Sequence, residues 1–140
     1  MQKFKTSKKE KILYNLAKMS KKIFLKRTFH FDAAHQVTDY NGKCENLHGH
    51  TYVLTVTITG KLQKNGMVLD FAILKKIVNE TVLNKLDHKF LNDIFENPTT
   101  ENIAIFIFDA LQEAFKKYGC SVHEVSLSEG INNTAVIRSV

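Results

Sequence analysis

The chain has 140 residues, of which 44% are apolar and ten are phenylalanine. This length suits one domain with a substantial hydrophobic core and is short for two. No apolar run approaches the length of a membrane span, and the N-terminus lacks the pattern of a signal peptide. With only two cysteines, Cys44 and Cys120, a disulfide framework is not expected. We therefore expect a soluble protein of a reducing compartment, the cytoplasm.

The formal net charge of +6 is concentrated at the N-terminus. Residues 1–22 hold eight lysines and one glutamate, whereas residues 23–140 hold 12 basic and 13 acidic side chains. The basic charge therefore belongs to a tail, and the domain of residues 23–140 is near neutral. A lysine-rich tail is most often a solvated, poorly ordered extension. A nucleic-acid-binding arm is the less favoured alternative, so we expect neither a nucleic-acid nor a membrane partner.

Two strands are predicted in the first half of the domain. Residues 23–31 are rich in aromatic and branched side chains, which favour a strand. Residues 32–46 contain the turn formers Asp39, Asn41 and Gly42 and are predicted to be a loop. Residues 51–62 alternate between apolar and polar side chains, the pattern of a second strand, and an Asn-Gly turn at 65–66 follows it.

Two helices and two further strands are predicted in the second half. After Asp70 the apolar residues recur with the period of an amphipathic helix. Pro98 and the capping sequence Thr99-Thr100-Glu101 announce a second helix, which is expected to end near Gly119. Residues 122–128 and 134–140 are predicted to be short strands joined by a turn.

This order of elements predicts an α+β domain. Its four-stranded antiparallel sheet is expected to carry both helices on one face. Such a sheet has two open edges, which proteins pair, cover or blunt. We therefore expect pairing between subunits and a homo-oligomer.

A pair of histidines at the start of the second strand indicates a metal site. His48 and His50 point to the same side of a strand, because side chains alternate along it. Zinc takes at least three protein ligands, and His35, at the end of FDAAH, is the best third candidate. His30 is the rival, but its position between two phenylalanines suits packing better. Other transition metals also bind three imidazoles.

Cys44 decides between two kinds of zinc site. If it binds the metal, four ligands close a structural site, whereas three histidines alone leave an open position, as in catalytic zinc. Structural sites usually carry two or more cysteines, often as C-x-x-C, and this chain has no such pair. The pattern favours an open site with Cys44 beside it as a thiol whose pKa a cation could lower. On spacing alone, Cys44 could also be a plain loop residue.

Three further residues are candidates for chemistry. Asp87 and His88 follow the first predicted helix, where they could orient and polarise a reacting group or simply form a favourable helix end. Glu129 ends the third predicted strand. It could be a surface acid or, if it faces a pocket, it could bind a ligand that presents adjacent N–H donors.

Six stretches, taken together, resemble one family of enzymes. They run in order from Phe29 to about Glu129 and read FHFDAAH, CENLHGHTY, GMVLDF, LDHKFLND, NPTTENIA and SLSEG. The chain resembles the family of 6-pyruvoyl tetrahydropterin synthase and 6-carboxytetrahydropterin synthase, most closely the bacterial carboxytetrahydropterin branch. The resemblance implies the tunnel fold (T-fold), in which two-helix, four-strand subunits form trimeric barrels that stack as a hexamer. Active sites would lie between subunits.

The resemblance also implies a role for each matching residue. His35, His48 and His50 match the ligands of one zinc ion per subunit. Cys44 matches the cysteine that removes a proton from the substrate. The charge-relay and acid/base pair is matched by Asp87 and His88. The pterin-anchoring glutamate is matched by Glu129. The segment that lines the pterin pocket is matched by Thr99, Thr100 and Glu101.

The family's substrate is 7,8-dihydroneopterin triphosphate. One branch makes a pyruvoyl product, and the other releases acetaldehyde and triphosphate to give 6-carboxy-5,6,7,8-tetrahydropterin for queuosine. Three residues separate Cys44 from His48, as in the second branch, so the resemblance favours a zinc-dependent lyase of that branch. The alternatives are a pyruvoyl synthase or a non-catalytic, zinc-stabilised binding module. Two positions depart from the family: Gln36 replaces a common arginine, and Gly130 a common threonine.

Overall fold

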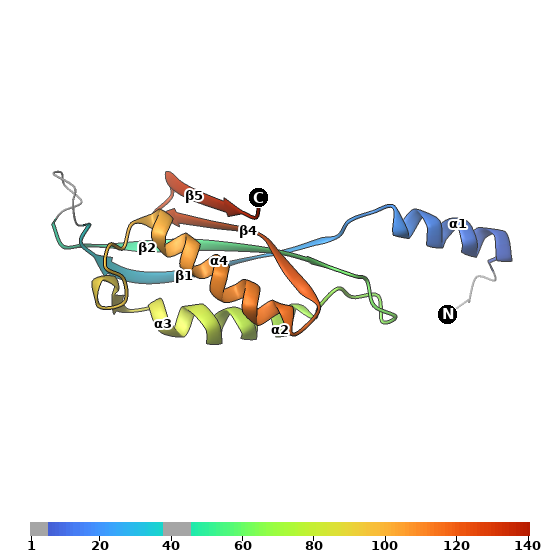
Figure 1. The fold of residues 1–140 in the computed structure, drawn as a ribbon, viewed down its shortest axis with the longest axis horizontal. Helices are drawn as coiled ribbons and strands as arrows, with labels where there is room; N and C mark the ends of the chain where they lie inside the picture. The colour runs from blue at the N-terminus through green and yellow to red at the C-terminus, as the bar shows by residue number, and fades with distance from the viewer. Residues whose placement is uncertain (1–5, 38–45) are drawn as a thin grey trace.

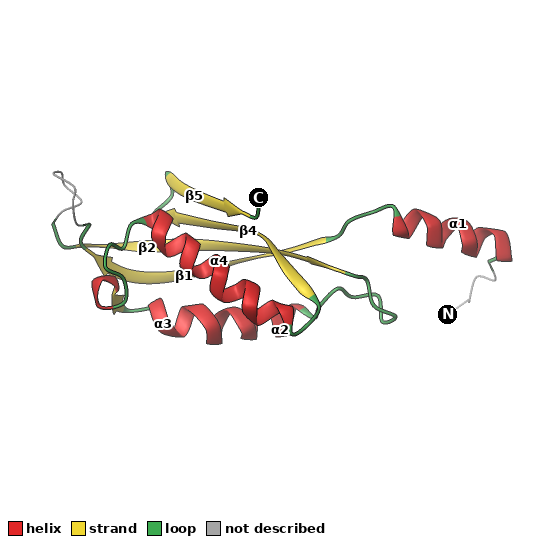
Figure 2. Ribbon diagram, viewed as in Figure 1, coloured by secondary structure: helices red, strands yellow, loops and turns green. Residues whose placement is uncertain are grey.

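The computed structural model describes residues 6–37 and 46–140 of the chain. A five-stranded sheet, in the order β3-β1-β2-β4-β5, is packed against helices (Figures 1 and 2). The strands are β1 (Phe24–His35), β2 (His48–Gly60), β3 (Lys89–Phe90), β4 (Cys120–Glu129) and β5 (Asn133–Arg138). The helices are α1 (Lys8–Met19), α2 (Phe71–Val78), α3 (Asn84–Leu86) and α4 (Thr100–Lys116). A π-helical turn η2 (Asn79–Leu83) joins α2 to α3, and a 3-10 turn η3 (Leu91–Asp93) follows β3.

The prediction of four antiparallel strands is wrong in one respect. The short strand β3 pairs with β1 in parallel, through Ala33 with Lys89 and Ala34 with Phe90, so the sheet has five strands and is mixed. The other three pairings are antiparallel, as predicted. A two-residue strand is too short to show an alternating pattern in the sequence. It matters here because it fixes the segment around residues 87–92 beside β1.

The hairpin of β1 and β2 is longer than predicted at the end that carries the histidines. β1 continues to His35 and β2 begins at His48, so residues 32–35 of the predicted 32–46 loop and residues 48–50, ahead of the predicted second strand, are strand. Residues 38–45 of that loop lie outside the described residues. The last pair of the hairpin is His35 with His48. The pairing extends this far because both strands keep alternating, with Phe31 and Ala33 buried opposite Tyr52 and His50.

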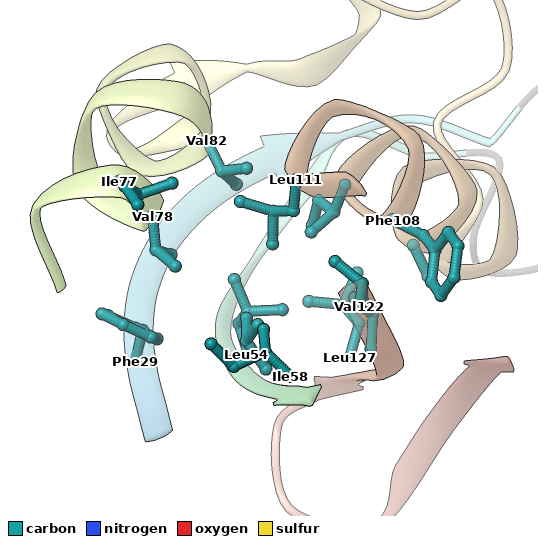
Figure 3. Close-up of a cluster of buried hydrophobic side chains, with 14 of the residues drawn as sticks. Phe29, Leu54, Ile58, Ile77, Val78, Val82, Phe108, Leu111, Val122 and Leu127 are labelled. Atoms are coloured by element: carbon teal, nitrogen blue, oxygen red, sulfur yellow. The ribbon is translucent and has the colours of Figure 1, made fainter. Parts of the chain in front are cut away.

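The hydrophobic core lies between one face of the sheet and the helices (Figure 3). Leu54, Ile58 and Leu127 rise from the sheet and meet Val78 of α2 and Leu111 of α4. Both predicted helices are present, and both have side-chain N-caps: Asp70 accepts from the Ala72 N–H, and Thr99 accepts from the Asn102 N–H. Thr99 is thus the N-cap of α4, within the capping sequence that was predicted to announce this helix.

The N-terminal segment contains a helix that the sequence analysis missed. Ser7 and Glu10 form a capping box, in which each side chain accepts a hydrogen bond from the other's main chain. No residue of α1 is buried, and the helix projects away from the sheet (Figure 1). Within the part of the chain that the structure describes, no helix has the length and apolarity needed to cross a membrane.

Candidate metal centre

Three histidines meet at the end of the β1–β2 hairpin. The register pairs His35 with His48 and Ala33 with His50, so the three imidazoles lie on one face of the sheet. One ring nitrogen from each histidine lies within 4.8 Å of the others. The structure therefore brings together the three residues that the sequence proposed as ligands. The rival His30 is exposed and falls on the opposite face of β1 by alternation.

Hydrogen bonds fix the protonation of two of these rings. His35 Nδ1 lies 2.7 Å from the Pro98 carbonyl oxygen, and His48 Nδ1 lies 2.6 Å from the Asn46 carbonyl oxygen. A carbonyl only accepts, so each Nδ1 carries the proton and donates it. In the neutral rings both Nε2 atoms then present lone pairs, yet they lie only 2.8 Å apart. Two facing lone pairs repel unless a cation lies beside them, so this donor set fits a metal ion.

His50 completes the donor set. Its Nε2 is buried and has no hydrogen-bond partner among the described residues. Burial lowers the pKa of His50, and this outweighs the opposite effect of the Glu129 carboxylate; the two neighbouring histidines lower it further. A neutral imidazole is the form that binds a metal. A buried, neutral and unpartnered nitrogen aimed at two others fits a third ligand.

Glu129 lies against the histidine cluster. Its carboxylate oxygens are 3.7 Å from His35 Nε2 and 3.8 Å from His50 Nε2. The residue ends β4 and is paired with Tyr52 of β2, which turns its side chain toward the histidines. Burial and the Glu129 charge both raise the pKa of Tyr52, so the phenol keeps its proton. A half-buried acid thus borders the cluster.

Glu129 also lines a polar cavity of about 490 Å³. Thr100 and Glu101, at the start of α4, form one wall, as the sequence analysis proposed for a ligand pocket. Thr99 does not line it, because its hydroxyl caps α4. Residues of the β4–β5 turn and of β5 also line the cavity, and the sequence pattern predicted only a turn there: Asn132, Asn133, Thr134 and Ala135. Only their position just after Glu129 could have indicated this.

Asp87 and His88 do contact each other, but they lie on the far side of β1 from β2. Asp87 Oδ1 is 2.9 Å from His88 Nδ1 and accepts a 3.0 Å hydrogen bond from the Asp32 N–H. β1 separates this pair from the strand that carries His48 and His50. His88 is 78% exposed. Its φ of 58° is unusual for a residue with a side chain, and such strain often marks functional sites.

The Asp87 carboxyl is held as a carboxylate. Burial raises its pKa, but the hydrogen bond from Asp32 and the interactions with His88 together outweigh burial and lower it. Cys44, proposed as the proton-removing thiol, lies outside the described residues. The other cysteine, Cys120, is buried, and burial raises the pKa of its thiol.

A family model described as 6-pyruvoyl tetrahydropterin synthase matches residues 24–139. Among curated proteins, the 6-carboxy-5,6,7,8-tetrahydropterin synthase of Synechocystis sp. is 43% identical over 95 residues, which cover 63% of this chain and 74% of that protein. The dihydroneopterin monophosphate aldolase of Pyrococcus furiosus is 48% identical over 83 residues, covering 59% of this chain and 69% of that protein.

Solved structures show the same fold. The Caenorhabditis elegans 6-pyruvoyl tetrahydropterin synthase superposes with a TM-score of 0.75 at 28% sequence identity, covering 86% of this chain and 97% of that one. The family match begins at the first residue of β1, so the helix α1 lies outside it. The three histidines, Glu129 and the polar cavity lie within it.

Proposed function

Because this chain belongs to the 6-pyruvoyl tetrahydropterin synthase family, an enzyme family with a lyase-type reaction, we propose that it is a zinc-dependent carboxytetrahydropterin synthase. It would convert 7,8-dihydroneopterin triphosphate into 6-carboxy-5,6,7,8-tetrahydropterin, with release of acetaldehyde and triphosphate, for the queuosine (deazaguanine) route. The observation that carries this proposal is the cluster of three histidines beside a polar cavity walled by Glu129.

His35, His48 and His50 would hold one zinc ion per subunit. The fixed Nδ1 protons of His35 and His48 support this, because they aim both Nε2 lone pairs at the same point. Zinc bound there would act as a Lewis acid that polarises the hydroxyl groups of the substrate side chain and acidifies the neighbouring C–H.

The polar cavity would bind the pterin ring. Glu129 would accept hydrogen bonds from adjacent ring N–H groups, because a carboxylate matches a guanidine-like edge. Thr100 and Glu101 line the same cavity and would contact the rest of the ring. The proximity of Glu129 to His35 and His50 supports this, because a ring held by Glu129 would lie beside the metal and the substrate side chain would reach it.

Proton transfer would fall to Cys44 and the Asp87–His88 pair. The Cys44 thiolate would remove the proton from the acidified C–H, after which triphosphate leaves by elimination. Asp87 would orient His88 and stabilise its protonated form, and His88 would return a proton. The 2.9 Å contact between the two residues supports this pairing.

A subunit would obtain its acid/base pair from a neighbour. β1 lies between His88 and the strand carrying His48 and His50, and neighbouring strands are about 4.8 Å apart. In the described part of the chain, β3 and β5 are the edge strands of the sheet, where a neighbouring subunit could pair. These observations support a homohexamer built as two stacked trimers, with the Asp87–His88 pair of one subunit facing the metal of another.

Two observations favour testing two other pterin reactions as well. The Caenorhabditis elegans structure is of a pyruvoyl synthase, and the Pyrococcus furiosus relative is named as acting on a monophosphate. Mass spectrometry of products separates these reactions when the zinc-loaded protein is given dihydroneopterin triphosphate or the monophosphate. Carboxytetrahydropterin with acetaldehyde supports the proposal. A pyruvoyl product, or turnover of the monophosphate alone, would move the chain to the corresponding reaction. No turnover by folded, zinc-loaded protein would indicate a binding module.

A further inference from the structure

Hydrogen bonds join the segment Asp87–Asn92 to β1 and to Gln36, the residue that follows it. Asp87 Oδ1 accepts from the Asp32 N–H, and the His88 N–H donates to the Asp32 carbonyl at 2.7 Å. Lys89 and Phe90 then pair with Ala33 and Ala34 as the short strand β3. The last bonds are made by the side chain of Asn92.

Asn92 pairs with both main-chain groups of one residue. Its Oδ1 accepts from the Gln36 N–H at 2.8 Å, and its Nδ2 donates to the Gln36 carbonyl at 2.7 Å. A carboxamide offers the same donor and acceptor as a peptide group, so Asn92 acts here as one more residue of the strand. The main chain itself has already turned into the 3-10 helix η3.

Among the described residues, Gln36 has no pairing partner in the sheet. The β1–β2 register ends at His35 with His48, and the β1–β3 register ends at Ala34 with Phe90. Gln36 is therefore the first residue beyond β1, and the carboxamide of Asn92 supplies both of its main-chain hydrogen bonds in the structure. Without Asn92 the end of β1 would be free to fray at this point.

The residue next to Gln36 is His35, the most buried of the three histidines, with 1% of its side chain exposed. Its ring Nδ1 lies 2.7 Å from the Pro98 carbonyl oxygen and 3.3 Å from the Tyr52 hydroxyl, and its Nε2 must point at the other two histidines. The direction of the ring depends on where its own main chain lies. Fixing the main chain one residue further on therefore fixes the ring.

We propose that Asn92 is a positioning residue for the metal centre: by pairing with the main chain of Gln36, it holds the His35 imidazole in the ligand geometry. The inference rests on the proposed function only in that the three histidines bind zinc. The same segment carries Asp87 and His88 at its other end. It therefore joins an acid/base pair and a metal ligand into one bonded unit along β1.

The zinc affinity of Asn92 variants tests this inference. Asn92→Ala removes both bonds, and the isosteric Asn92→Asp keeps the acceptor but replaces the donor with a second acceptor that faces the Gln36 carbonyl. Asn84→Ala, at an exposed asparagine of α3, is the matched control. We expect zinc affinity, measured by competition with a chelator, to fall about tenfold in both Asn92 variants, the lower end of the range for residues that orient metal ligands. The control should bind zinc like the unchanged chain.

A second readout separates positioning from a general loss of stability. Saturating zinc should restore most of the kcat of Asn92→Ala with an unchanged KM for the pterin, because the ligand geometry and not the pterin pocket is altered. Zinc affinity within twofold of the control in both variants, with only a lower Tm, would overturn the inference. His48→Ala is measured alongside: if it too keeps full zinc affinity, the metal centre itself is wrong, whereas loss of zinc in His48→Ala alone overturns only the role of Asn92.

Discussion

The two ends of the molecule are built in opposite ways. The helix α1 is specified by neighbours in sequence: the Ser7–Glu10 capping box starts it, and none of its residues is buried. The histidine cluster is specified by distant segments, since His35 is bonded to Pro98 and adjoins Glu129. Family similarity covers the second end and stops before the first.

This difference shows what a functional site requires beyond secondary structure. Local capping suffices to begin a helix, but it brings no chemical groups from elsewhere into contact. The cluster needs the hairpin register, the β2–β4 register and the start of α4 to agree at one point. Changes at the cluster are therefore expected to have large effects, and changes at α1 small ones.

Removing one of the three proposed histidine ligands is expected to have the largest effect. In His48→Ala, zinc should be lost and kcat should fall at least about a thousandfold, because the Lewis acid contributes several kcal/mol to the reaction. Metal content by mass spectrometry and product formation measure the two losses. His30→Ala, at the exposed histidine on the other face of β1, is the control and should keep both.

Glu129→Gln separates the proposed pterin anchor from the proposed metal ligands. A charge-assisted hydrogen bond contributes about 1.5–3 kcal/mol, so kcat/KM should fall between about tenfold and a hundredfold. The zinc content should stay at one per subunit. Since Glu129 lies within 4 Å of two histidines, loss of zinc would instead make it a metal ligand.

A pair of leucine substitutions compares the two ends directly. Leu54, on β2, is fully buried, whereas Leu16, on α1, is 57% exposed. Leu54→Ala should lower the free energy of unfolding by about 2–5 kcal/mol, and Leu16→Ala should change it by less than about 0.5 kcal/mol. Chemical denaturation measures both values. A comparable loss in Leu16→Ala would mean that α1 is packed against something in solution.

Lowering the pH should reveal how much the Asp87 carboxylate contributes to the stability of the fold. The pKa of its carboxyl lies below the ordinary value of 3.8, so its stabilising effect is present above that pH and is lost as the pH falls through the lowered pKa. Asp87→Asn keeps the acceptor for Asp32 but cannot titrate. As the pH is lowered below 4, the Tm of Asp87→Asn should therefore fall less steeply than the Tm of the unchanged chain. The difference should be small, because 41% of the side chain is exposed; equal slopes would contradict it.

Removal of residues 1–22 should have the smallest effect. The family match begins at residue 24, and α1 buries none of its side chains. Tm, zinc content and kcat should therefore match those of the full chain in thermal denaturation, metal analysis and product assays. A lower kcat with unchanged zinc would assign α1 a part in the active enzyme.

The sequence predicted the parts of the site that depend on alternation. The spacing of His48 and His50 placed both on one face of a strand, and a hairpin sufficed to bring His35 to them. The pattern also predicted that a helix begins at the capping sequence Thr99-Thr100-Glu101, and Thr99 is its N-cap. These predictions succeeded because each rests on a short-range rule that tertiary packing did not override.

The register between strands that are distant in the chain could not be predicted from the sequence. Glu129 reaches the histidines only through its pairing with Tyr52, and the β2–β4 ladder shifts register at Thr57 and Ile58, which no pattern announced. The parallel strand β3 was missed because two residues carry no period. The helix α1 is different, because Ser7 and Glu10 have the spacing of a capping box in the sequence. The prediction of a poorly ordered tail rested on the lysine content alone and did not use this signal.

The coordination of zinc tests the central claim most directly, because it separates an open catalytic site from a closed structural one. X-ray absorption of the zinc-loaded protein should show three imidazole nitrogens near 2.0–2.1 Å and an oxygen from water, with no sulfur. That result would leave the fourth position to the substrate and Cys44 to proton transfer. A sulfur ligand near 2.3 Å would instead make Cys44 the fourth ligand and contradict the proposed enzyme mechanism.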